Sequence, residues 1–233
     1  MAGSDIKALT IDTGGTVLDW HSGIREALAT TGQRHGLERD WVKVTNDYRR
    51  AAIRRMVNQE NPGFNMDDVH REVLGEIVEQ HELEAFSQAD REGIVARWHS
   101  LDAWPDVAEA LRRLRRRHIV AALSILSVSI VIDTSRRNAL HWDVVIGCEM
   151  LGVYKPRPEA YRKAAELLQL RPEQILMVAA HGFDLDAAAG VGYRTALVRR
   201  PSEWGPVANS VESGQPDADI AVASFGELAD QLG

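Results

Sequence analysis

Short apolar segments alternate with amphipathic segments along most of this chain. The apolar segments show no regular alternation with polar residues, which is typical of strands buried on both faces of a parallel sheet. Among the polar connections, residues 201–219 are rich in proline, glycine and serine and are predicted to form a surface loop. The predicted strands cover residues 7–11, 119–123, 144–146, 175–179, 195–198 and 220–222.

The amphipathic segments that follow most of these strands carry apolar residues at helical spacing. When strands and helices alternate, the strands run parallel and the helices cover both faces of the sheet. We therefore predict an α/β protein whose core is a doubly wound, Rossmann-like parallel sheet. The predicted core helices cover residues 104–117, 127–140, 158–168 and 184–190.

The region between the first two predicted strands breaks this alternation. It contains helical patterns and no convincing strand, with a predicted turn at residues 61–63 (Asn-Pro-Gly). A helical block inserted directly after the first strand is typical of a cap over the sheet. We expect residues 18–98 to form a helical cap domain, and residues 1–17 together with 99–233 to form the core. The predicted cap helices cover residues 23–35, 41–58, 66–81 and 87–98.

The composition is that of a globular protein, with 45% apolar and 26% charged residues in a chain of 233. No apolar run approaches the ~20 residues that a membrane span requires, and the first residues lack the apolar stretch of a signal peptide. The one cysteine, Cys148, excludes an internal disulfide and a multi-cysteine zinc site. These features predict a cytoplasmic protein without a membrane partner.

The charge pattern argues against nucleic-acid binding. The net charge is −7, which does not favour contact with a phosphate backbone. Arginines at positions 112, 113, 115, 116 and 117 lie late in a predicted amphipathic helix, where positive charges complement the helix dipole and face water. We therefore expect a small-molecule partner and no nucleic acid.

A carboxylate and two glycines follow the first predicted strand, at the edge of the sheet where such folds bind their ligands. Residues 12–16 read Asp-Thr-Gly-Gly-Thr. Gly14 and Gly15 let a substrate approach the backbone, and the N–H groups around Thr13 and Gly14 can cradle an anion. Asp12 is either a reactive carboxylate in this turn or a residue that only caps it.

Chemically active side chains also follow the next two predicted strands. Ser124 comes after the second strand, where we expect it to open the following helix and either favour an anion or act as a plain helix cap. Lys155 precedes Pro156, which favours an extended conformation. Its ammonium group either holds the carboxylate of Asp12 or lies in solvent.

The loop after the fourth predicted strand carries His181, Phe183 and Asp184. His181 and Asp184 are candidates for activating water, with a structural histidine and a capping aspartate as the alternatives. Because the carboxyl ends of parallel strands lie along one edge of the sheet, the four loops converge on one crevice. This joint placement favours an active site over unrelated structural roles.

The four loops resemble the motifs of the haloacid dehalogenase superfamily. Those motifs are an Asp-x-x-Gly-Thr loop, a Ser or Thr after the second strand, a Lys and an acidic fourth loop. The resemblance is greatest to the (S)-2-haloacid dehalogenases and covers nearly the whole chain. The matching residues are Asp12, Ser124, Lys155 and Asp184, and the matching stretches are residues 12–20, 154–161, 178–188 and 195–205.

The resemblance implies a reaction in two covalent steps. Asp12, held by Lys155, would attack C2 of a small 2-haloacid and expel the halide, which leaves an ester on Asp12. Water positioned by Asp184 and His181 would then hydrolyse this ester to a 2-hydroxyacid.

The resemblance also implies which residues bind the substrate. Ser124 would bind the substrate carboxylate, and Tyr161 would line the site. Arg49 would receive the departing halide, although the neighbouring Arg50 is an alternative for this role. The remaining residues expected to contact the substrate or the oxyanion are Thr13, Gly14, Ile125 and Phe183.

Two positions distinguish this chain from the magnesium-dependent phosphatases of the same superfamily. Those enzymes place a second Asp where Gly14 stands and a metal-binding Asp where Ala180 stands. Without these carboxylates a hard cation has too few oxygen ligands, and an alkoxide leaving group lacks its acid. A halide leaves without either, so we predict a metal-independent dehalogenase with no cofactor.

Three positions depart from the usual dehalogenase pattern. Dehalogenases usually have an aromatic residue at Gly14 and Asn at Ile125, and many have Asn at His181. These departures leave two alternatives: a phosphatase-like hydrolase of another small acid or phosphate ester, with Asp186 supplying a ligand, or a binding protein whose site has decayed. The resemblance also allows a homodimer.

Overall fold

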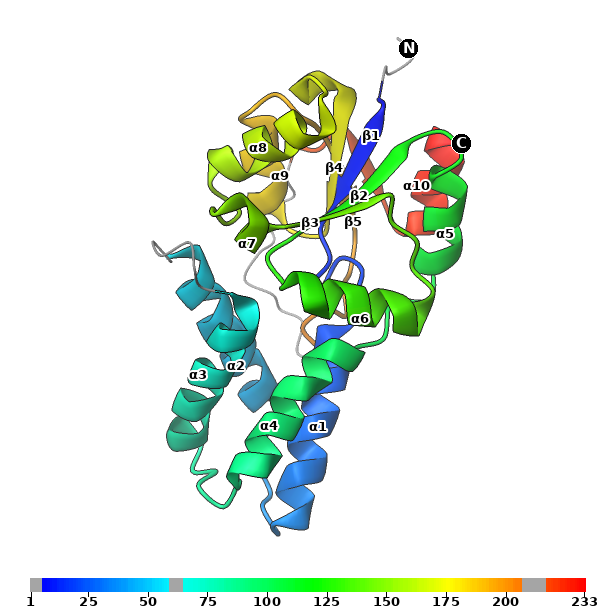
Figure 1. The fold of residues 1–233 in the computed structure, drawn as a ribbon. Helices are drawn as coiled ribbons and strands as arrows, with labels where there is room; N and C mark the ends of the chain where they lie inside the picture. Colours follow the sequence, from blue (N-terminus) through cyan, green and yellow to red (C-terminus); the bar gives the residue numbers. More distant parts are fainter. Residues whose placement is uncertain (1–5, 59–64, 207–216) are drawn as a thin grey trace.

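A parallel sheet forms the centre of the molecule (Figure 1). The computed structural model describes residues 6–58, 65–206 and 217–233, and within them the sheet has six strands in the order β3-β2-β1-β4-β5-β6. All neighbouring strands pair in parallel, which confirms the predicted doubly wound sheet. The strands are β1 (Ala8–Ile11), β2 (Ile119–Ser124), β3 (Val144–Gly147), β4 (Ile175–Ala179), β5 (Arg194–Val198) and β6 (Ile220–Val222).

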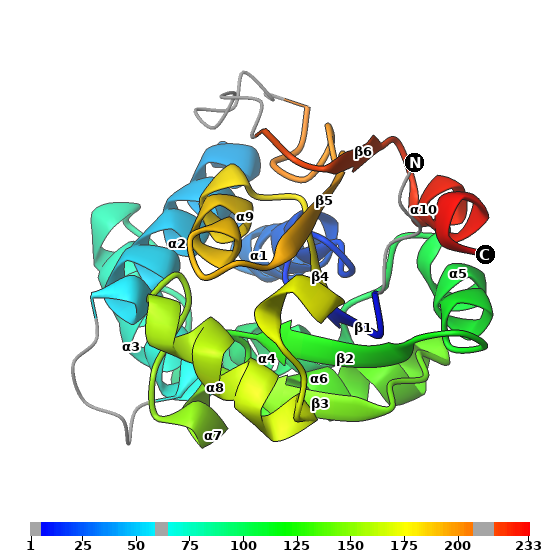
Figure 2. The same ribbon diagram turned by 90° about the horizontal axis from the view of Figure 1, so that it is seen from above.

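Helices cover both faces of this sheet because alternate side chains of each strand point to opposite sides. Leu9 of β1 packs into the apolar core on the side of α5 and α10, whereas Ala8 packs on the side of α8 and α9. Figure 2 shows these two helix pairs on opposite sides of the sheet. The core helices are α5 (Val107–Leu114), α6 (Val128–Asn138), α7 (Cys148–Leu151), α8 (Pro158–Leu168), α9 (Gly182–Ala189) and α10 (Phe225–Leu232).

A separate group of helices stands at one end of the sheet (Figure 1). Their starts are set by side-chain caps: Asp19 accepts a hydrogen bond from Ser22 N, Asp40 accepts one from Lys43 N, and Ser87 caps the fourth helix. This is the helical block expected after the first strand. Its members are α1 (Trp20–Arg34), α2 (Trp41–Val57), α3 (Met66–Gln80) and α4 (Gln88–Ala96), followed by the short helix η1 (Arg97–Ser100).

Several predicted details differ from the structure. Ser124 does not open a helix, because it ends β2 and α6 begins only after Ser127, whose side chain accepts a hydrogen bond from Ile130 N. The short helix α7 and the C-terminal helix α10 were not predicted. The turn predicted at residues 61–63 lies outside the described residues. Among the helices that the structure does describe, none is long and apolar enough to cross a membrane.

Candidate active site

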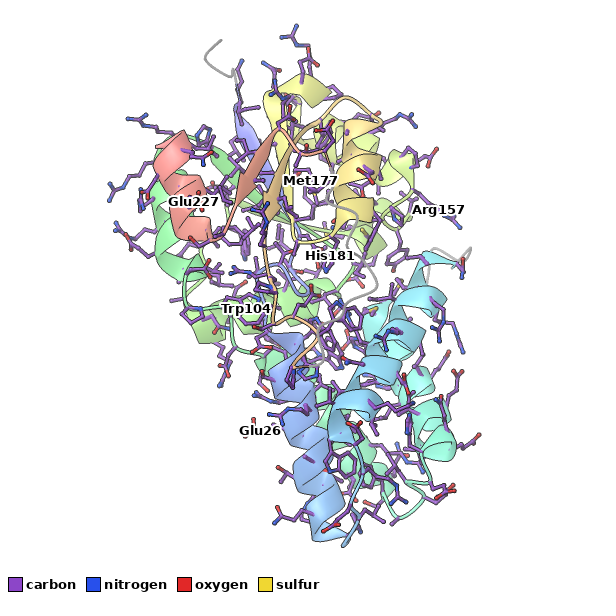
Figure 3. The ribbon with its side chains drawn as sticks, turned by 180° about the vertical axis from the view of Figure 1, so that it is seen from behind. Glu26, Trp104, Arg157, Met177, His181 and Glu227 are labelled. Carbon is purple, nitrogen blue, oxygen red and sulfur yellow. The ribbon has the colours of Figure 1, made fainter. Side chains whose placement is uncertain are left out.

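The carboxyl ends of β1, β2 and β4 bring the predicted residues to one place. Asp12 directly follows β1, Ser124 ends β2, and His181 follows β4. β1 and β4 are neighbours in the sheet although β2 and β3 lie between them in the chain, so they form the switch point where ligands bind in such folds. Figure 3 shows His181 at the boundary between the sheet and the cap helices.

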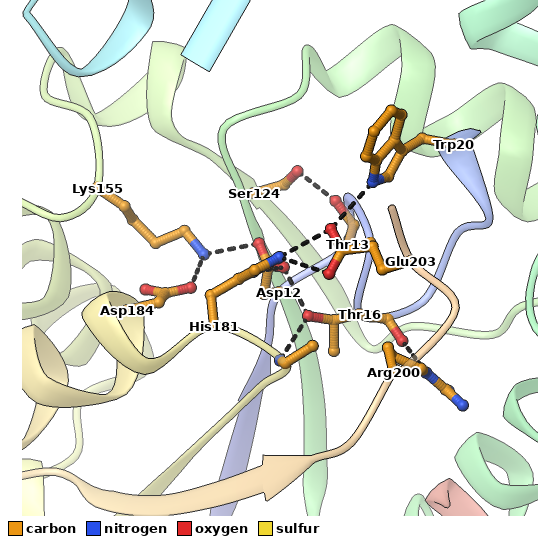
Figure 4. A network of polar contacts seen from close by, with 12 residues as sticks. Asp12, Thr13, Thr16, Trp20, Ser124, Lys155, His181, Asp184, Arg200 and Glu203 are labelled. Carbon is orange, nitrogen blue, oxygen red and sulfur yellow. Dashed lines mark hydrogen bonds and ion pairs between the residues drawn. The ribbon is translucent and has the colours of Figure 1, made fainter. Parts of the chain in front are cut away.

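Asp12 is a buried carboxylate, 4% exposed, with a partner on each oxygen. Oδ1 accepts a hydrogen bond from Lys155 Nζ at 2.9 Å, and Oδ2 accepts one from Thr16 Oγ1 at 2.7 Å (Figure 4). Burial alone would raise the pKa of Asp12, but the charge of Lys155 and the contact with His181 outweigh it and hold this pKa well below its usual range. The side chain is therefore an ionised carboxylate, as a nucleophile must be.

Lys155 is the cation that links the two buried carboxylates of the site. Its Nζ donates to Asp12 Oδ1 at 2.9 Å and to Asp184 Oδ2 at 2.6 Å, and the residue is only 3% exposed. Burial opposes the charge, but the two carboxylates raise the pKa of Lys155 above its ordinary value. A permanent ammonium group therefore lies between Asp12 and Asp184, and the alternative of a solvated lysine is wrong.

Asp184 uses both of its carboxylate oxygens within the protein. Oδ2 accepts a hydrogen bond from Lys155, and Oδ1 accepts one from the hydroxyl of Tyr161. Burial and the neighbouring charge of Asp12 raise the pKa of Asp184, against the lowering effect of Lys155. Tyr161 thus contacts the site through Asp184.

His181 lies between two carboxylates. Its Nδ1 is 3.4 Å from Asp12 Oδ2, and its Nε2 is 2.9 Å from Oε1 and 3.1 Å from Oε2 of Glu203. Burial opposes the charged ring, but Glu203 and Asp12 together raise the pKa of His181 well above its usual value. Glu203 was not among the predicted site residues, because it falls in the segment expected to be a surface loop, yet it is only 5% exposed.

Ser124 and Thr13 lie against each other. Their hydroxyl oxygens are 2.5 Å apart, and Ser124 Oγ also accepts a hydrogen bond from Leu126 N at 3.0 Å. Both residues are buried. The structure thus places both hydroxyls beside the nucleophile, while the predicted contact of Ser124 with a substrate carboxylate stays a prediction.

Arg49, rather than Arg50, lines the same cavity as Asp12. Arg49 is 2% exposed, and its guanidinium carbon is 5.4 Å from the ring centroids of both Trp20 and Trp98. A Cβ on Gly14 would come within 2.9 Å of Arg49 Nη2, so the missing side chain makes room for this guanidinium. Arg50 is exposed and lies over the ring of Trp204 instead.

A cavity of about 30 Å³ lies between these groups, walled by the sheet loops on one side and by α2 on the other. A larger cavity of about 440 Å³ lies between α3 and α4, and none of the residues that follow the strands lines it. We therefore take the smaller cavity as the candidate active site. Its walls include the predicted residues Asp12, Gly14, Arg49, Ile125, Lys155, His181, Phe183 and Asp184, together with Ile53, Val57 and Trp204.

The family model of the haloacid dehalogenase-like hydrolases matches residues 6–192 of this chain. The chain therefore belongs to the haloacid dehalogenase-like hydrolases, and the resemblance inferred from its sequence is confirmed. It follows that the protein is a hydrolase with the fold of this family.

Several of the similar proteins are 2-haloacid dehalogenases. The (S)-2-haloacid dehalogenase 4A of Burkholderia cepacia is 27% identical over 221 residues, which cover 89% of this chain and 91% of that protein. A solved L-2-haloacid dehalogenase superposes with a TM-score of 0.88 at 30% identity, covering 97% of this chain and 98% of that one. A solved defluorinating L-2-haloacid dehalogenase also gives a TM-score of 0.88, at 31% identity, covering 97% and 95%.

Phosphatases are also among the similar proteins. The phosphoglycolate phosphatase of Aquifex aeolicus is 25% identical over 216 residues, covering 93% of this chain and 92% of that protein. The choice between the two chemistries therefore depends on the residues of the site itself.

Proposed function

We propose that this protein hydrolyses small 2-haloacids to 2-hydroxyacids through a covalent ester with Asp12. One observation carries the proposal: an ionised Asp12, held by Lys155, borders a small cavity that a buried Arg49 also lines. A carboxylate nucleophile facing a cation across a small cavity suits a displacement that releases an anion. The similarity to haloacid dehalogenases points the same way.

In the first step, Asp12 attacks C2 of the haloacid. A C–O bond forms, the carbon–halogen bond breaks, and the halide leaves with the bonding electrons. Arg49 faces the growing negative charge, so its attraction strengthens as the bond breaks and lowers the barrier. Ser124 and the backbone around Thr13 are proposed to hold the substrate carboxylate, and Phe183 and Ile125 to border the carbon chain.

In the second step, water attacks the carbonyl carbon of the Asp12 ester. The product is a 2-hydroxyacid, the carboxylate of Asp12 is regenerated, and one proton is released. Backbone N–H groups at Thr13 and Gly14 are proposed to stabilise the oxyanion that forms on the ester carbonyl. The cap of residues 18–98 is part of this proposal, because α2 contributes Arg49.

The residues present do not fit the magnesium ion that related phosphatases require. Gly14 and Ala180 offer no side-chain oxygen. Asp12 and Asp184 are joined by the ammonium group of Lys155, which lies between them with a positive charge of its own. The carboxylate of Glu203 is bonded to His181 and Trp20. Too few oxygen ligands remain for a hard cation, so we propose metal-independent chemistry.

Halide release tests this proposal against its alternatives. We expect chloride and bromide release from chloroacetate and bromoacetate, unchanged by EDTA or added magnesium. Asp12→Asn should abolish release while leaving the fold intact, because an amide is a far weaker nucleophile of nearly the same shape. Turnover of phosphate esters that requires magnesium would favour the phosphatase alternative, and no turnover of either class would favour a decayed binding protein.

A further inference from the structure

Glu203 is a buried carboxylate with no role in the two steps proposed above. It lies in the loop after β5 and is 5% exposed. Its Oε1 accepts a hydrogen bond from Trp20 Nε1 at 3.0 Å, and its two oxygens lie 2.9 and 3.1 Å from Nε2 of His181 (Figure 4). Buried carboxylates with specific charged partners cluster at functional sites, so this position beside the nucleophile indicates a role in the reaction.

The nucleophile loop is shaped to admit this carboxylate. Gly15 has a φ of +96°, a left-handed conformation that favours glycine. A Cβ at this position would overlap the carboxylate of Glu203. The second glycine of the Asp-Thr-Gly-Gly-Thr turn thus gives Glu203 direct access to the space beside Asp12.

The contacts of Glu203 fix which nitrogen of His181 carries a proton. An ionised carboxylate only accepts hydrogen bonds, so Nε2 must donate its proton to Glu203. In the neutral ring, Nδ1 is then the basic nitrogen. That nitrogen faces Asp12, 3.4 Å from Oδ2, on the side where an ester would form.

Asp184 is placed differently. Its two oxygens accept hydrogen bonds from Lys155 and Tyr161, and the residue is 1% exposed. Both oxygens are thus occupied by donors within the protein, and the carboxylate orients Lys155. The charge of Asp12, which helps to raise the pKa of Asp184, is lost when the ester forms, so Asp184 becomes a weaker proton acceptor in the second step. The basic nitrogen of His181 is the better placed of the two groups.

We propose that Glu203 is a positioning residue that holds His181 with Nδ1 toward the Asp12 ester, so that His181 rather than Asp184 accepts the proton of the attacking water. This inference rests on the proposed function, because it concerns the second of its two steps. An acid that fixes the tautomer of a basic histidine is a recurrent arrangement in hydrolytic sites.

The protons and electrons of the step balance as follows. Nδ1 of His181 takes a proton while the water oxygen bonds to Cγ of Asp12, which gives a tetrahedral oxyanion. The bond from Cγ to the bridging ester oxygen, which came from the Asp12 carboxylate, then breaks, and the departing alkoxide takes the proton from His181. The Asp12 carboxylic acid that remains passes its proton to His181, which restores the ionised carboxylate and the protonated ring of the resting site.

The first step prepares His181 for this role. While Asp12 is ionised, two carboxylates flank the ring, and the pKa of His181 lies well above its usual value despite burial. Ester formation removes the charge of Asp12 and leaves Glu203 as the acid in contact with the ring. The pKa of His181 then falls, so the ring releases its extra proton to solvent and becomes a base after the ester has formed.

Pre-steady-state measurements on Glu203→Gln test the inference. With bromoacetate, the variant should release one equivalent of bromide rapidly and then stall, because ester hydrolysis slows by roughly 10²–10³-fold when its base, His181, is no longer held in position. Intact mass should show a carboxymethyl group added to the protein, at Asp12. His181→Asn should accumulate the same ester, whereas Asp184→Asn should slow the bromide burst itself.

A matched control separates positioning from loop structure. Asp106 anchors the same loop through Arg200, with Nη1 donating to Oδ2 at 3.0 Å, and it lies outside the cavity. Asp106→Asn should hydrolyse its ester at close to the wild-type rate. Ester accumulation in Asp106→Asn equal to that in Glu203→Gln would overturn the inference in favour of loop misplacement.

The pH dependence of ester hydrolysis adds a readout that a structural role would not change. The charged groups facing His181 are Asp12 and Glu203, with Lys155 and Arg49 bordering the same cavity. Wild-type hydrolysis should speed up as pH rises through the pKa of His181 in the ester. Glu203→Gln removes a negative charge, lowers that pKa and should move the midpoint to lower pH.

The outcomes distinguish the two proposals. If the wild type releases no halide from any 2-haloacid, the proposed function fails. If the wild type releases halide but neither Glu203→Gln nor His181→Asn accumulates an ester, the function stands and the inference fails. Should Glu203→Gln not fold, ester accumulation in His181→Asn but not in Asp184→Asn would still support His181 as the proton acceptor. The reverse pattern would overturn the inference.

Discussion

At the scale of single residues, an absent side chain explains how a cap arginine reaches the nucleophile. Gly14 leaves space that Arg49 Nη2 fills, since a Cβ there would lie only 2.9 Å from it. The guanidinium of Arg49 packs over the rings of Trp20 and Trp98. The sequence showed only that Gly14 lacks the aromatic side chain usual in dehalogenases. It did not show that Arg49 fills this space, because Arg49 comes from α2, far from Gly14 in the chain.

Gly14→Ala should therefore reduce halide release by about tenfold, which corresponds to about 1.4 kcal/mol of barrier. The added methyl group would push Arg49 away from the departing halide. Gly75→Ala is the matched control, because a Cβ at Gly75 meets nothing within 4 Å. That control should keep full activity and gain up to about 1 kcal/mol of stability in its helix. Equal activity of both variants would refute the assigned contact.

Ile125 borders the same cavity where many dehalogenases place an asparagine. An asparagine would add a second hydrogen-bond donor to the leaving halide beside Arg49. Ile125→Asn should then raise turnover, with a larger gain on fluoroacetate than on bromoacetate, because fluoride is the poorer leaving group and the better acceptor. Slower turnover of chloroacetate, bromoacetate and fluoroacetate by a folded variant would instead favour a substrate with an apolar group at this position.

At the scale of elements, the sequence predicted the strands and the loops that carry chemistry. Buried parallel strands give continuous apolar runs, and a ligand site at their carboxyl ends follows from the topology. The contact between Glu203 and Trp20 was out of reach, because it joins residues 183 positions apart through an irregular loop. The polar composition of that loop predicted exposure, which is wrong for Glu203.

Helix α2 offers a direct comparison of two of its arginines. Arg49 lines the cavity and is 2% exposed, whereas Arg54 lies on the solvent side of the same helix. Arg49→Ala should lower kcat by roughly 10²–10³-fold, because it removes a group that meets charge in the transition state. Arg54→Ala should change kcat little. Similar small effects of the two substitutions would mean that the halide contact was assigned to the wrong residue.

A histidine joins the helical cap to the sheet core. His99 lies 2.8 Å from Asp67 of α3 and 2.8 Å from Asp133 of α6. Burial opposes its charge, but the two carboxylates raise the pKa of His99 above its ordinary value. The stabilisation is thus complete below the unfolded pKa of about 6.5 and is lost as pH rises through the higher folded value.

Asp133→Asn should therefore destabilise the protein more at pH 5.5 than at pH 9. The expected difference in unfolding free energy is on the order of 0.5 kcal/mol, because both side chains are partly exposed. Urea unfolding at the two pH values measures it. Asp230→Asn, which breaks the exposed pair of Asp230 with Arg113, is the control and should show no such pH dependence.

At the scale of the whole molecule, the site exists because two parts of the chain meet. The sheet supplies the nucleophile, its lysine and the His181–Glu203 pair at the switch point between β1 and β4. The helices inserted after β1 supply Arg49. Sequence patterns predicted both parts separately, but which of their residues contact each other follows only from the packing.

The most direct test of the central claim is a single turnover in heavy-oxygen water, with enzyme in excess over a 2-haloacid. If the reaction passes through an ester with Asp12, the new oxygen of the 2-hydroxyacid comes from the carboxylate. The product of this first turnover should be unlabelled, and the label should appear in Asp12. Label found mainly in the product of the first turnover would mean direct attack by water and would contradict the account.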